Sequence, residues 1–242
     1  MGSAADTWHG YKARSFELLA LAEGDQVLDV GCGTGDDART IAGRVAGVSV
    51  IGIDASDEKI REARARTLGL PRPVDFRVAD AYALPFEDES FDACRADRVL
   101  HHLVDPAKAL LEMARVTRPG GRVVVSDTDY DSLVVEAPDP RLTGRIVAHH
   151  ADRMECGRVG RRLPGLFRDA ALEAVAVTPY GAVVTEYDEE VLKLRDKAER
   201  AAAAGVITHA DATRWVESLV EADRAGRFVC ALIVLTVSAR KP

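Results

Sequence analysis

A glycine-rich segment near the start of the chain is its clearest candidate for ligand binding. The apolar run 27–30 leads directly into residues 31–35, Gly-Cys-Gly-Thr-Gly. Glycine is needed where the backbone turns tightly and a ligand approaches without a Cβ in the way. The third glycine, Gly35, comes one residue too early for the dinucleotide fingerprint G-x-G-x-x-G, and the Gly-Lys-Ser/Thr of a Walker loop is absent. Because Asp36 and Asp37 would repel a pyrophosphate at the next helix, the segment predicts a nucleoside-like ligand without phosphate.

Two carboxylates follow apolar runs at places where they can bind the same ligand. Asp54 ends the run 48–54, 23 residues after Gly31, and a carboxylate there accepts hydrogen bonds from both ribose hydroxyls. Asp80 follows the run 74–78, where a carboxylate can accept from an exocyclic amine such as that of adenine. Each has a structural alternative, because Asp54 can cap the next helix and Asp80 can cap a loop. The ribose role is the favoured hypothesis for Asp54, and both roles stay open for Asp80.

Four histidines are candidates for a general base. His101 and His102 follow the run 91–95, and His149 and His150 lie in a segment predicted to be helical. The histidine side chain titrates near neutral pH, which suits proton abstraction from an acceptor. The alternative for His102 is structural, because it can hold the helix that follows it. Adjacent residues on a helix face different ways, so at most one of His149 and His150 points inward.

Two arginines are candidates for substrate contacts. Arg98 would bind an acidic or hydroxylated substrate or pair with a carboxylate, and Arg153 lies on the predicted helix that carries the second histidine pair. Asp127, Asp129 and Asp131 alternate after the fifth apolar run, so they would share one face of an extended segment. Solvated loop acids are the favoured interpretation there, rather than magnesium ligands, and no metal site is predicted.

These residues must be positioned by an alternation of strands and helices. Short apolar runs alternate with helical patterns from residue 15 to about residue 175, which predicts βαβ units and a parallel sheet. Near-continuous apolar runs suit strands covered on both faces. The predicted strands are 26–30, 48–54, 74–78, 91–95, 122–126, 172–184 with a break at its Pro-Tyr-Gly, and 228–237. The predicted helices are 15–23, 36–45, 57–68, 106–116, 141–154, 161–170, 188–204 and 210–224.

The whole chain, residues 1–242, is predicted to be one domain. Residues 18–128 would form the cofactor-binding core. Residues 130–158, irregular apart from one helix, and residues 188–226 would be insertions that form a cap for the substrate. They would cover the carboxyl edge of the sheet, which is where ligands bind in open α/β sheets.

The composition narrows the class of protein further. With 242 residues and 47% hydrophobic content, the chain can fold without a disulfide or a metal. Its 32 basic and 39 acidic residues give a net charge of −7, which disfavours nucleic acid as a partner. The four cysteines are scattered without a C-x-x-C pair, no apolar run reaches the length of a membrane span, and the N-terminus does not resemble a signal peptide. A cytoplasmic protein without a membrane partner is therefore expected.

Four segments together resemble the class I S-adenosylmethionine-dependent methyltransferases. VLDVGCGTG is similar to the first motif of that family, GIDAS to the second, VADAYALPFEDESFD to the third, and RVLHHLVDPAKALLEMARVTRPGGRVVV to the link between the fourth and fifth strands. The resemblance is close from residue 18 to residue 125 and nearest to the small-molecule enzymes of ubiquinone and menaquinone biosynthesis and of natural-product tailoring. It implies an α/β, Rossmann-like sheet of seven mostly parallel strands, with helices on both faces and helical insertions as a substrate cap.

The resemblance also implies which residues bind the cofactor, S-adenosyl-L-methionine. The glycines would pass along its methionine portion and ribose, Asp29 would support the loop and the amino group, and Asp97 would lie near the methionine end. An N-terminal aromatic residue, Trp8 or Tyr11, would close over the cofactor, with a role as a packing anchor as the alternative. The complete predicted set is Tyr11, Asp29, Gly31, Cys32, Gly33, Thr34, Gly35, Asp54, Ala55, Asp80, Ala81 and Asp97.

The activity that the resemblance implies is methyl transfer to a small-molecule acceptor by in-line displacement, with a hydroxyl favoured and carbon or nitrogen left open. One alternative is a cyclase or rearrangement enzyme that binds the same cofactor without methyl transfer. Others are a nicotinamide-dependent oxidoreductase, which the early third glycine disfavours, and a non-catalytic binding protein. No Asn-Pro-Pro-Tyr-like segment follows the fourth strand, so a nucleic-acid substrate is not expected. The expected state is a monomer or a homodimer.

Overall fold

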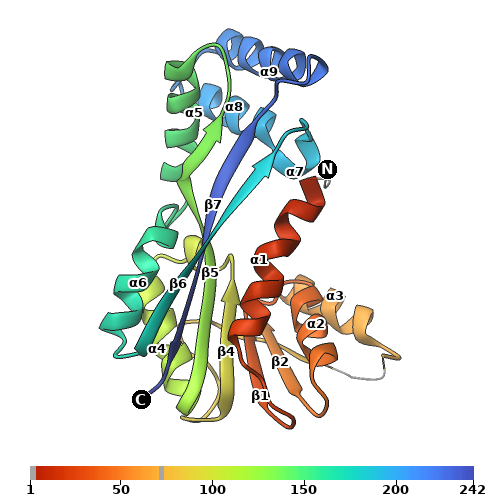
Figure 1. The fold of residues 1–242 in the computed structure, drawn as a ribbon, viewed down its shortest axis with the longest axis vertical. Coiled ribbons are helices and arrows are strands. Elements are labelled where there is room, and N and C mark those ends of the chain that lie inside the picture. Colours follow the sequence, from red (N-terminus) through yellow and green to blue (C-terminus); the bar gives the residue numbers. More distant parts are fainter. Residues whose placement is uncertain (1–3, 71–73) are drawn as a thin grey trace.

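The computed structural model describes residues 4–70 and 74–242, with the backbone alone for residues 4–9. Its centre is a seven-stranded sheet in the order β3-β2-β1-β4-β5-β7-β6 (Figure 1). The strands are β1 (Gln26–Val30), β2 (Ser49–Asp54), β3 (Asp75–Val78), β4 (Phe91–Asp97), β5 (Thr117–Val135), β6 (Glu173–Val184) and β7 (Cys230–Arg240). β7 is antiparallel to both of its neighbours, and the other neighbouring pairs are parallel. This confirms the predicted Rossmann-like sheet of seven mostly parallel strands.

Helices cover both faces of the sheet, because successive residues of a strand point to opposite sides. The helices are α1 (Ala4–Leu18), α2 (Asp36–Arg44), α3 (Asp57–Thr67), η1 (Leu100–His102), α4 (Pro106–Val116), α5 (Pro140–Asp152), α6 (Val159–Asp169), α7 (Glu189–Leu192), α8 (Leu194–Ala203) and α9 (His209–Arg224). Leu28 of β1 and Cys94 of β4 belong to a core shared with α4 and α6. Their neighbours Val27 and Ala93 belong to a core on the other face, shared with α1, α2 and α3.

Two predicted helices differ from the observed ones. The predicted helix 15–23 is wrong in its bounds, because α1 ends at Leu18 and Ala20 has a left-handed φ of 50°. Most of α1 precedes residue 15 in a stretch with few apolar side chains, so a hydrophobic pattern does not reveal it. The predicted helix 188–204 is divided at Lys193, whose φ of 49° ends α7 and begins α8.

β5 and β6 are also longer and more continuous than predicted. The predicted strand 122–126 is the middle of β5, and residues 130–135, predicted to be irregular, continue that strand. β5 crosses a register shift between Asp129 and Val134 and then pairs again with β7. The predicted break near Pro179 is wrong, because Pro179 pairs with Leu235 inside β6. β6 is an edge strand, where a missing N–H group is tolerated.

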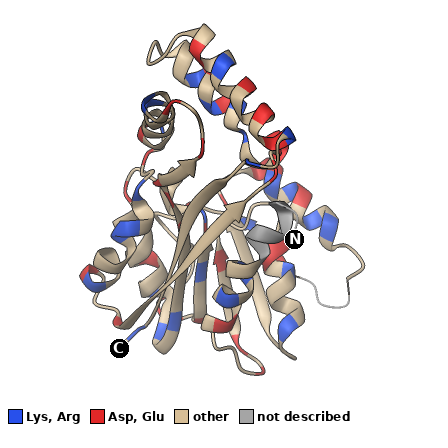
Figure 2. Ribbon diagram, turned by 45° about the horizontal axis from the view of Figure 1, so that its top comes forward, with Lys and Arg blue, Asp and Glu red and all other residues tan. Residues whose placement is uncertain are grey.

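The extended ends of β5, β6 and β7 carry a helical lobe, seen at the top of Figure 1, which we call the upper lobe and define by α5, α7, α8 and α9. It has a core of its own that includes Ile146, Leu194 and Leu219. Within that core, the indole N–H of Trp215 donates a hydrogen bond of 2.9 Å to Oγ1 of Thr143. Figure 2 shows acidic and basic residues interspersed along the helices of this lobe. The two segments predicted to be insertions, 130–158 and 188–226, therefore pack against each other, and their role as a substrate cap stays a prediction.

Gly35 joins the end of the glycine segment to α2 in a conformation that favours glycine. It is the N-cap of α2 with a φ of 82°, and a Cβ there would lie 2.6 Å from Cε1 of Phe76. Phe76 belongs to β3 and is buried in the core, so its ring cannot move aside without disturbing that core. Packing and backbone conformation together explain the need for glycine at this position.

We expect Gly35→Ala to lower the free energy of unfolding by about 1–3 kcal/mol, because the new side chain combines a strained backbone with overlap on Phe76. The matched control is Gly43→Ala, since Gly43 lies inside α2 and a Cβ there meets nothing within 4 Å. That variant should be stabilised by about 0.5–1 kcal/mol. Urea unfolding of the two variants checks this, and equal effects of the same sign would contradict it.

Candidate functional site

The glycine segment borders a cavity at the carboxyl ends of β1, β2 and β4, which we call the glycine-loop cavity. Its volume is about 390 Å³, and its wall includes Gly31, Asp54, Ala55, Asp80 and Ala81. All five were predicted from the sequence to bind the cofactor, and the structure brings them together around one space. A cavity of this size at the carboxyl edge of the sheet is typical of a small-molecule site in an open α/β fold.

Asp54 holds the glycine loop in place. Its Oδ2 accepts a hydrogen bond of 3.0 Å from the backbone N–H of Gly33, and its Oδ1 accepts one of 2.9 Å from that of Ser56. Gly31 and Gly33 have φ values of 68° and 56°. A Cβ on Gly33 would meet nothing within 4 Å, whereas one on Gly31 would lie 2.9 Å from Cγ1 of Val99. The loop therefore presents open backbone at Gly33 and is closely packed at Gly31.

The two residues between the glycines do not line this cavity. The Thr34 hydroxyl donates to Asp36 at the start of α2. Burial raises the pKa of the Cys32 thiol, which therefore stays protonated at neutral pH. Neither side chain lines the cavity, and the contact of Cys32 and Thr34 with the cofactor stays a prediction.

A buried ionic cluster lies beside the loop and is centred on Arg95 in the middle of β4. The Arg95 side chain is 1% exposed, and its guanidinium lies 3.1 Å from Asp29, 2.9 Å from Asp37 and 3.6 Å from Asp97. Lys12 of α1 adds a second cation, 2.9 Å from Asp37 and 3.4 Å from Asp97. Burial works against the charged form of Arg95, but the three carboxylates outweigh it and raise the pKa of the guanidinium. Sequence reasoning missed Arg95, although a basic residue in an otherwise apolar strand is a signal that can find it.

The predicted cofactor residues Asp29 and Asp97 are thus members of this cluster. Burial raises the pKa of Asp29 to about 6, with Arg95 acting in the opposite direction. Among the described residues, Oδ2 of Asp29 and Oδ1 of Asp97 are buried without a hydrogen-bond partner. Two carboxylate oxygens of this kind are suited to a cationic ligand, because a buried acceptor without a partner is costly.

Tyr11 is the aromatic residue that α1 brings to the cluster. Its hydroxyl donates to Oδ2 of Asp97 at 3.3 Å, and its ring lies 5.9 Å from that of Tyr180 on β6. Tyr11 is 2% exposed, and burial raises the pKa of its phenol, followed by the effect of Asp97. The structure therefore places Tyr11 beside Asp97, the residue predicted to lie near the methionine end of the cofactor. The closure of Tyr11 over the cofactor stays a prediction. The side chain of Trp8, the other candidate, lies outside the described residues.

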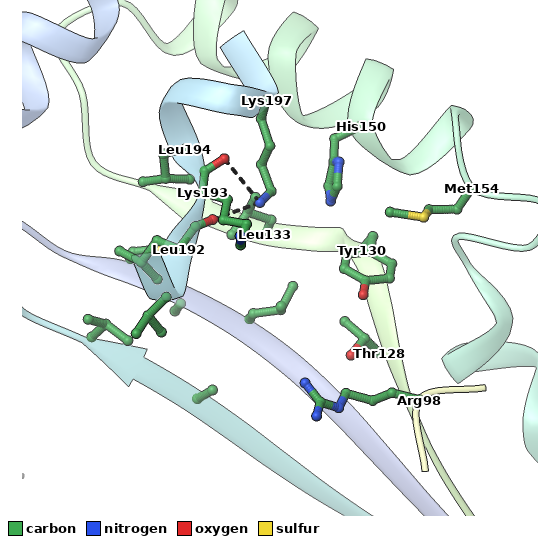
Figure 3. Close-up of a pocket in the computed structure, with 16 residues that line it drawn as sticks. Arg98, Thr128, Tyr130, Leu133, His150, Met154, Leu192, Lys193, Leu194 and Lys197 are labelled. Carbon is green, nitrogen blue, oxygen red and sulfur yellow. Dashed lines mark hydrogen bonds between the residues drawn. The ribbon is translucent and has the colours of Figure 1, made fainter. Parts of the chain in front are cut away.

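A second cavity of about 410 Å³, which we call the lobe cavity, lies between the extended strands β5, β6 and β7 and the helices of the upper lobe (Figure 3). Arg98 and His150, both predicted from the sequence, line it. Tyr130 of β5 and Lys197 of α8 also line it, and sequence reasoning missed both. Their positions depend on the extension of β5 and on the packing of the upper lobe, neither of which has a local sequence signal.

Arg98 lines both cavities, and we call its position between them the junction. It follows β4 with a φ of 54°, a left-handed conformation that is uncommon for a residue with a side chain. Its backbone N–H donates to the carbonyl of Ser126 on β5 at 2.8 Å, which holds this conformation. Backbone strain of this kind is often concentrated at functional sites.

His101 forms a buried pair with Asp127. Nδ1 of His101 lies 2.7 Å from Oδ1 of Asp127, and the backbone N–H of His101 donates to Oδ2 of the same residue at 3.2 Å. The other ring nitrogen, Nε2, lies 3.5 Å from the hydroxyl of Tyr130. His102 instead lines the glycine-loop cavity and packs against His101, with the two ring centroids 3.9 Å apart and the ring planes tilted by 46°. Burial, followed by the effect of His101, lowers the pKa of His102. The two adjacent histidines therefore differ in their surroundings: His102 lines the glycine-loop cavity, whereas His101 is buried, lines neither cavity and reaches the wall of the lobe cavity through Tyr130.

The prediction that the acids after the fifth run are solvated is wrong for Asp127 and Asp129. Both are buried, because β5 continues through them and is covered by α6. Asp129 pairs with Arg161 of α6 at 2.8 Å, and Asp131 lies near the same arginine. Within the described part of the chain, no group of three or more His, Cys, Asp or Glu side chains is arranged to hold a metal ion.

α5 presents only one of its two adjacent histidines to the lobe cavity. His150 lines the cavity, whereas His149 does not. Burial lowers the pKa of His150 to about 4, followed by the charges of Lys197 and Arg153, so this ring is neutral at pH 7. Arg153 itself is exposed at the end of α5 and lines neither cavity, so its predicted substrate contact finds no support in this arrangement.

This geometry accompanies clear similarities to known proteins. Residues 28–125 match the family model described as a methyltransferase domain. An uncharacterized 37.1 kDa protein of transposon TN4556 from Streptomyces fradiae is 38% identical over 98% of this chain and 69% of its own length. The O-methyltransferase cnsE of Penicillium expansum is 36% identical over 66% of this chain and 56% of its own length. The solved structure of the cyclase SpnF has a TM-score of 0.60 at 26% identity, covering 96% of this chain and 80% of that one.

The chain belongs to the class I S-adenosylmethionine-dependent methyltransferases, which confirms the resemblance of its four motifs. Its cofactor is S-adenosyl-L-methionine. The chain spans little more than half the length of the Penicillium enzyme, so the acceptor is a matter for proposal. Among the described helices, none is long and apolar enough to cross a membrane.

The residues around the glycine-loop cavity fit this cofactor. Its sulfonium and amino groups are cationic, and Asp29 and Asp97 each have a buried carboxylate oxygen without a partner, in the ionic cluster beside the loop rather than on the cavity wall. The open backbone at Gly33 leaves room for a ligand to pass. Asp54 and Asp80 lie on the cavity wall, where carboxylates suit the hydroxyls and the amine of a nucleoside.

We expect the depressed pKa of His150 to make the fold less stable in acid. The ring takes up a proton near its ordinary pKa of 6.5 in the unfolded chain but only near 4 in the folded one. Between these values the unfolded state binds more protons, so stability is lost as the pH falls, by up to about 3 kcal/mol.

Urea unfolding between pH 7 and pH 4 measures this loss. His150→Phe keeps an aromatic ring against Tyr130 and should flatten the pH dependence of the free energy of unfolding. The exposed His209 supplies the control, and His209→Phe should retain the slope of the unaltered protein. Identical slopes for all three proteins would show that His150 is not responsible.

Proposed function

We propose that the protein transfers a methyl group from S-adenosylmethionine to a hydroxyl group of a small-molecule acceptor in the lobe cavity. The observation that carries the proposal is the His101–Asp127 pair, whose second imidazole nitrogen lies 3.5 Å from the Tyr130 hydroxyl on the cavity wall. A hydroxyl acceptor needs such a base, because the neutral hydroxyl is a weak nucleophile. The likeness to an O-methyltransferase of Penicillium expansum supports the same reaction.

The glycine-loop cavity would hold the cofactor, which supplies an electrophilic methyl group when bound. In this proposal Asp54 accepts hydrogen bonds from the ribose hydroxyls and Ala55 contacts the face of the adenine. Asp80 and Ala81 read its edge, on the same wall. The carboxylates of the ionic cluster hold the amino group through their unpartnered oxygens. Arg98, which lines both cavities, would lie between the bound cofactor and the acceptor.

Tyr130, His101 and Asp127 would move the proton of the acceptor. Asp127 accepts from Nδ1–H of His101, which leaves Nε2 as the proton acceptor facing Tyr130. Burial and then Asp127 raise the pKa of Tyr130, so its phenol stays protonated and passes a proton to His101 while taking one from the acceptor. The charge that forms on His101 is stabilised by Asp127. This arrangement favours His101 as the base over His102, His149 and His150.

We expect Asp54→Ala to weaken binding of S-adenosylhomocysteine by about 1–3 kcal/mol, which is roughly 5- to 150-fold, because hydrogen bonds to a charged group are lost. Calorimetric titration measures the effect. Asp57→Ala is the control, since Asp57 is exposed on α3 and pairs with Arg61. An Asp54 variant that binds as tightly as the unaltered protein would refute the ribose role.

We expect His101→Gln to reduce turnover of a hydroxyl acceptor by about 10²- to 10⁴-fold, the usual contribution of a general base, with little change in cofactor affinity. His102→Gln should reduce turnover less than His101→Gln and should instead affect cofactor binding, because His102 lines the glycine-loop cavity. Steady-state kinetics together with cofactor titration separate the two. The reverse ranking of the turnover losses would return the base to His102.

A direct assay tests the reaction itself. Purified protein and S-adenosylmethionine are incubated with a library of hydroxylated small molecules, followed by mass spectrometry of acceptor and cofactor. The proposal requires a product heavier by one methylene group and an equal amount of S-adenosylhomocysteine. A rearranged product of unchanged mass, without consumption of the cofactor, would favour cyclisation, the reaction named for the similar structure SpnF. Methylation confined to amines or carbon acids would contradict the hydroxyl assignment.

The acceptor reaches the lobe cavity beneath a cap formed by 130–158 and 188–226, with Arg98 as its contact at the junction. We propose a cytoplasmic enzyme that acts as a monomer or a homodimer on a small molecule rather than on nucleic acid.

A further inference from the structure

The lobe cavity has an unbalanced charge. Among the described residues that line it, Arg98, Lys193 and Lys197 are basic, and none is Asp or Glu. Most of the rest of its wall is aliphatic, with Leu133 and Leu192 among the contributors. This contrasts with the net charge of the chain, which is −7. A cavity of this kind suits a molecule with an apolar body and a negative group.

Lys197 is the cation whose partners are best defined. Its Nζ donates to the backbone carbonyl of Leu192 at 2.7 Å and more weakly to that of Lys193 at 3.4 Å (Figure 3). An ammonium group has three donors, so one is left for a ligand. Burial lowers the pKa of Lys197, which is the direction expected for a cation whose charge is not fully compensated.

The acids nearest to Lys197 are engaged elsewhere. Asp196 accepts from Nε of Arg200 at 2.6 Å. Glu189 accepts from the hydroxyl of Tyr187 at 2.6 Å and from the backbone N–H of Arg195 at 2.9 Å. Within the described part of the chain, no carboxylate forms an ion pair with Lys197. The fold therefore places a cation in this wall and directs the neighbouring acids to other partners.

His150 provides an independent indication of a ligand at the same place. Its side chain is 9% exposed, and among the described residues its Nε2 has no hydrogen-bond partner. Figure 3 shows His150 and Lys197 reaching into the cavity from α5 and α8 on the same side, with Arg98 at the opposite end. A buried polar atom without a partner is costly unless a ligand completes it.

We propose that the acceptor is an amphipathic molecule whose anionic group, a carboxylate or a phosphate ester, is bound by Lys197 and His150. Its apolar body lies against the aliphatic wall, and its hydroxyl extends towards Tyr130 and the junction at Arg98. A volume of about 410 Å³ accommodates a small molecule of this kind. The inference rests on the proposed function for the hydroxyl, but the anion site itself rests on the cavity.

Three probes with the same naphthalene body test the anion site: 2-naphthoate, 2-naphthamide and 2-naphthyl phosphate. Their dissociation constants are measured by calorimetry on the full chain with saturating S-adenosylhomocysteine, which keeps the probes out of the glycine-loop cavity. We expect at least one anionic probe to bind tenfold or more tightly than the neutral amide. Whichever anion binds more tightly identifies the head group as carboxylate or phosphate.

The variants assign this preference to Lys197. Lys197→Met should abolish the discrimination between anion and amide, Lys197→Gln should do the same while keeping a donor, and Lys197→Arg should restore most of it. Arg195→Met removes a charge from the same helix at an exposed position outside the cavity and should leave the preference unchanged. Thermal unfolding verifies that each variant is folded.

The inference is overturned if no probe binds, if the amide binds as tightly as both anions, or if Arg195→Met has the effect of Lys197→Met. These outcomes differ from a failure of the proposed function. Absence of methyl transfer to any hydroxyl would remove the function and leave the anion preference standing, whereas loss of the preference would leave methyl transfer intact.

Discussion

The ion pairs of the buried Arg95 guanidinium are the interactions on which the arrangement around the glycine loop depends. The guanidinium joins Asp29 at β1, Asp37 at α2 and Asp97 at the end of β4, and it also approaches the Ser15 hydroxyl and the Phe16 ring of α1. Moving such a charge out of water costs several kcal/mol, and only multiple carboxylates at short distance offset that cost. Separation of any one of these elements would leave a buried charge without its partner. The same network therefore holds the glycine loop, α1 and α2 in one arrangement around the place where the methionine end would lie.

The long strand β5 connects the parallel part of the sheet to the upper lobe. Its first half lies in the parallel sheet beside β4, and its second half supports the upper lobe through β7. Asp127 and Tyr130 lie between these halves, and Tyr130 lines the lobe cavity. The buried carboxylate of Asp127 pairs with His101 and orients its ring. The left-handed turn at Arg98 follows the end of β4, and Arg98 lines both cavities. One continuous strand thus links the parallel part of the sheet to the wall of the lobe cavity.

The sequence patterns identified more of the wall of the glycine-loop cavity than of the lobe cavity, for a physical reason. Glycines after an apolar strand and acids at strand ends act through local backbone geometry, so Gly31, Asp54 and Asp80 of this wall were predicted from their own neighbourhoods. Arg95 was missed because strand-pattern analysis expects apolar residues there, although its isolation in that strand is itself a signal. Asp127 was misjudged as solvated, since its burial depends on α6 and on the continuation of β5. Tyr130 and Lys197 have no motif, and they meet only because β5 and α8 enclose one space.

By itself the sequence determined the class of fold, the family and the cofactor loop, because apolar periodicity and glycine placement act over a few residues at a time. It also determined that His101 and His102 would follow the fourth predicted strand. Only the tertiary structure decided which histidine pairs with a carboxylate, which one borders the glycine-loop cavity, and which face of α5 is turned inward. It also decided that a cavity in an acidic protein is lined with basic side chains. These outcomes depend on contacts between residues far apart in the chain, where burial and pairing, rather than local spacing, set the charge and the direction of each group.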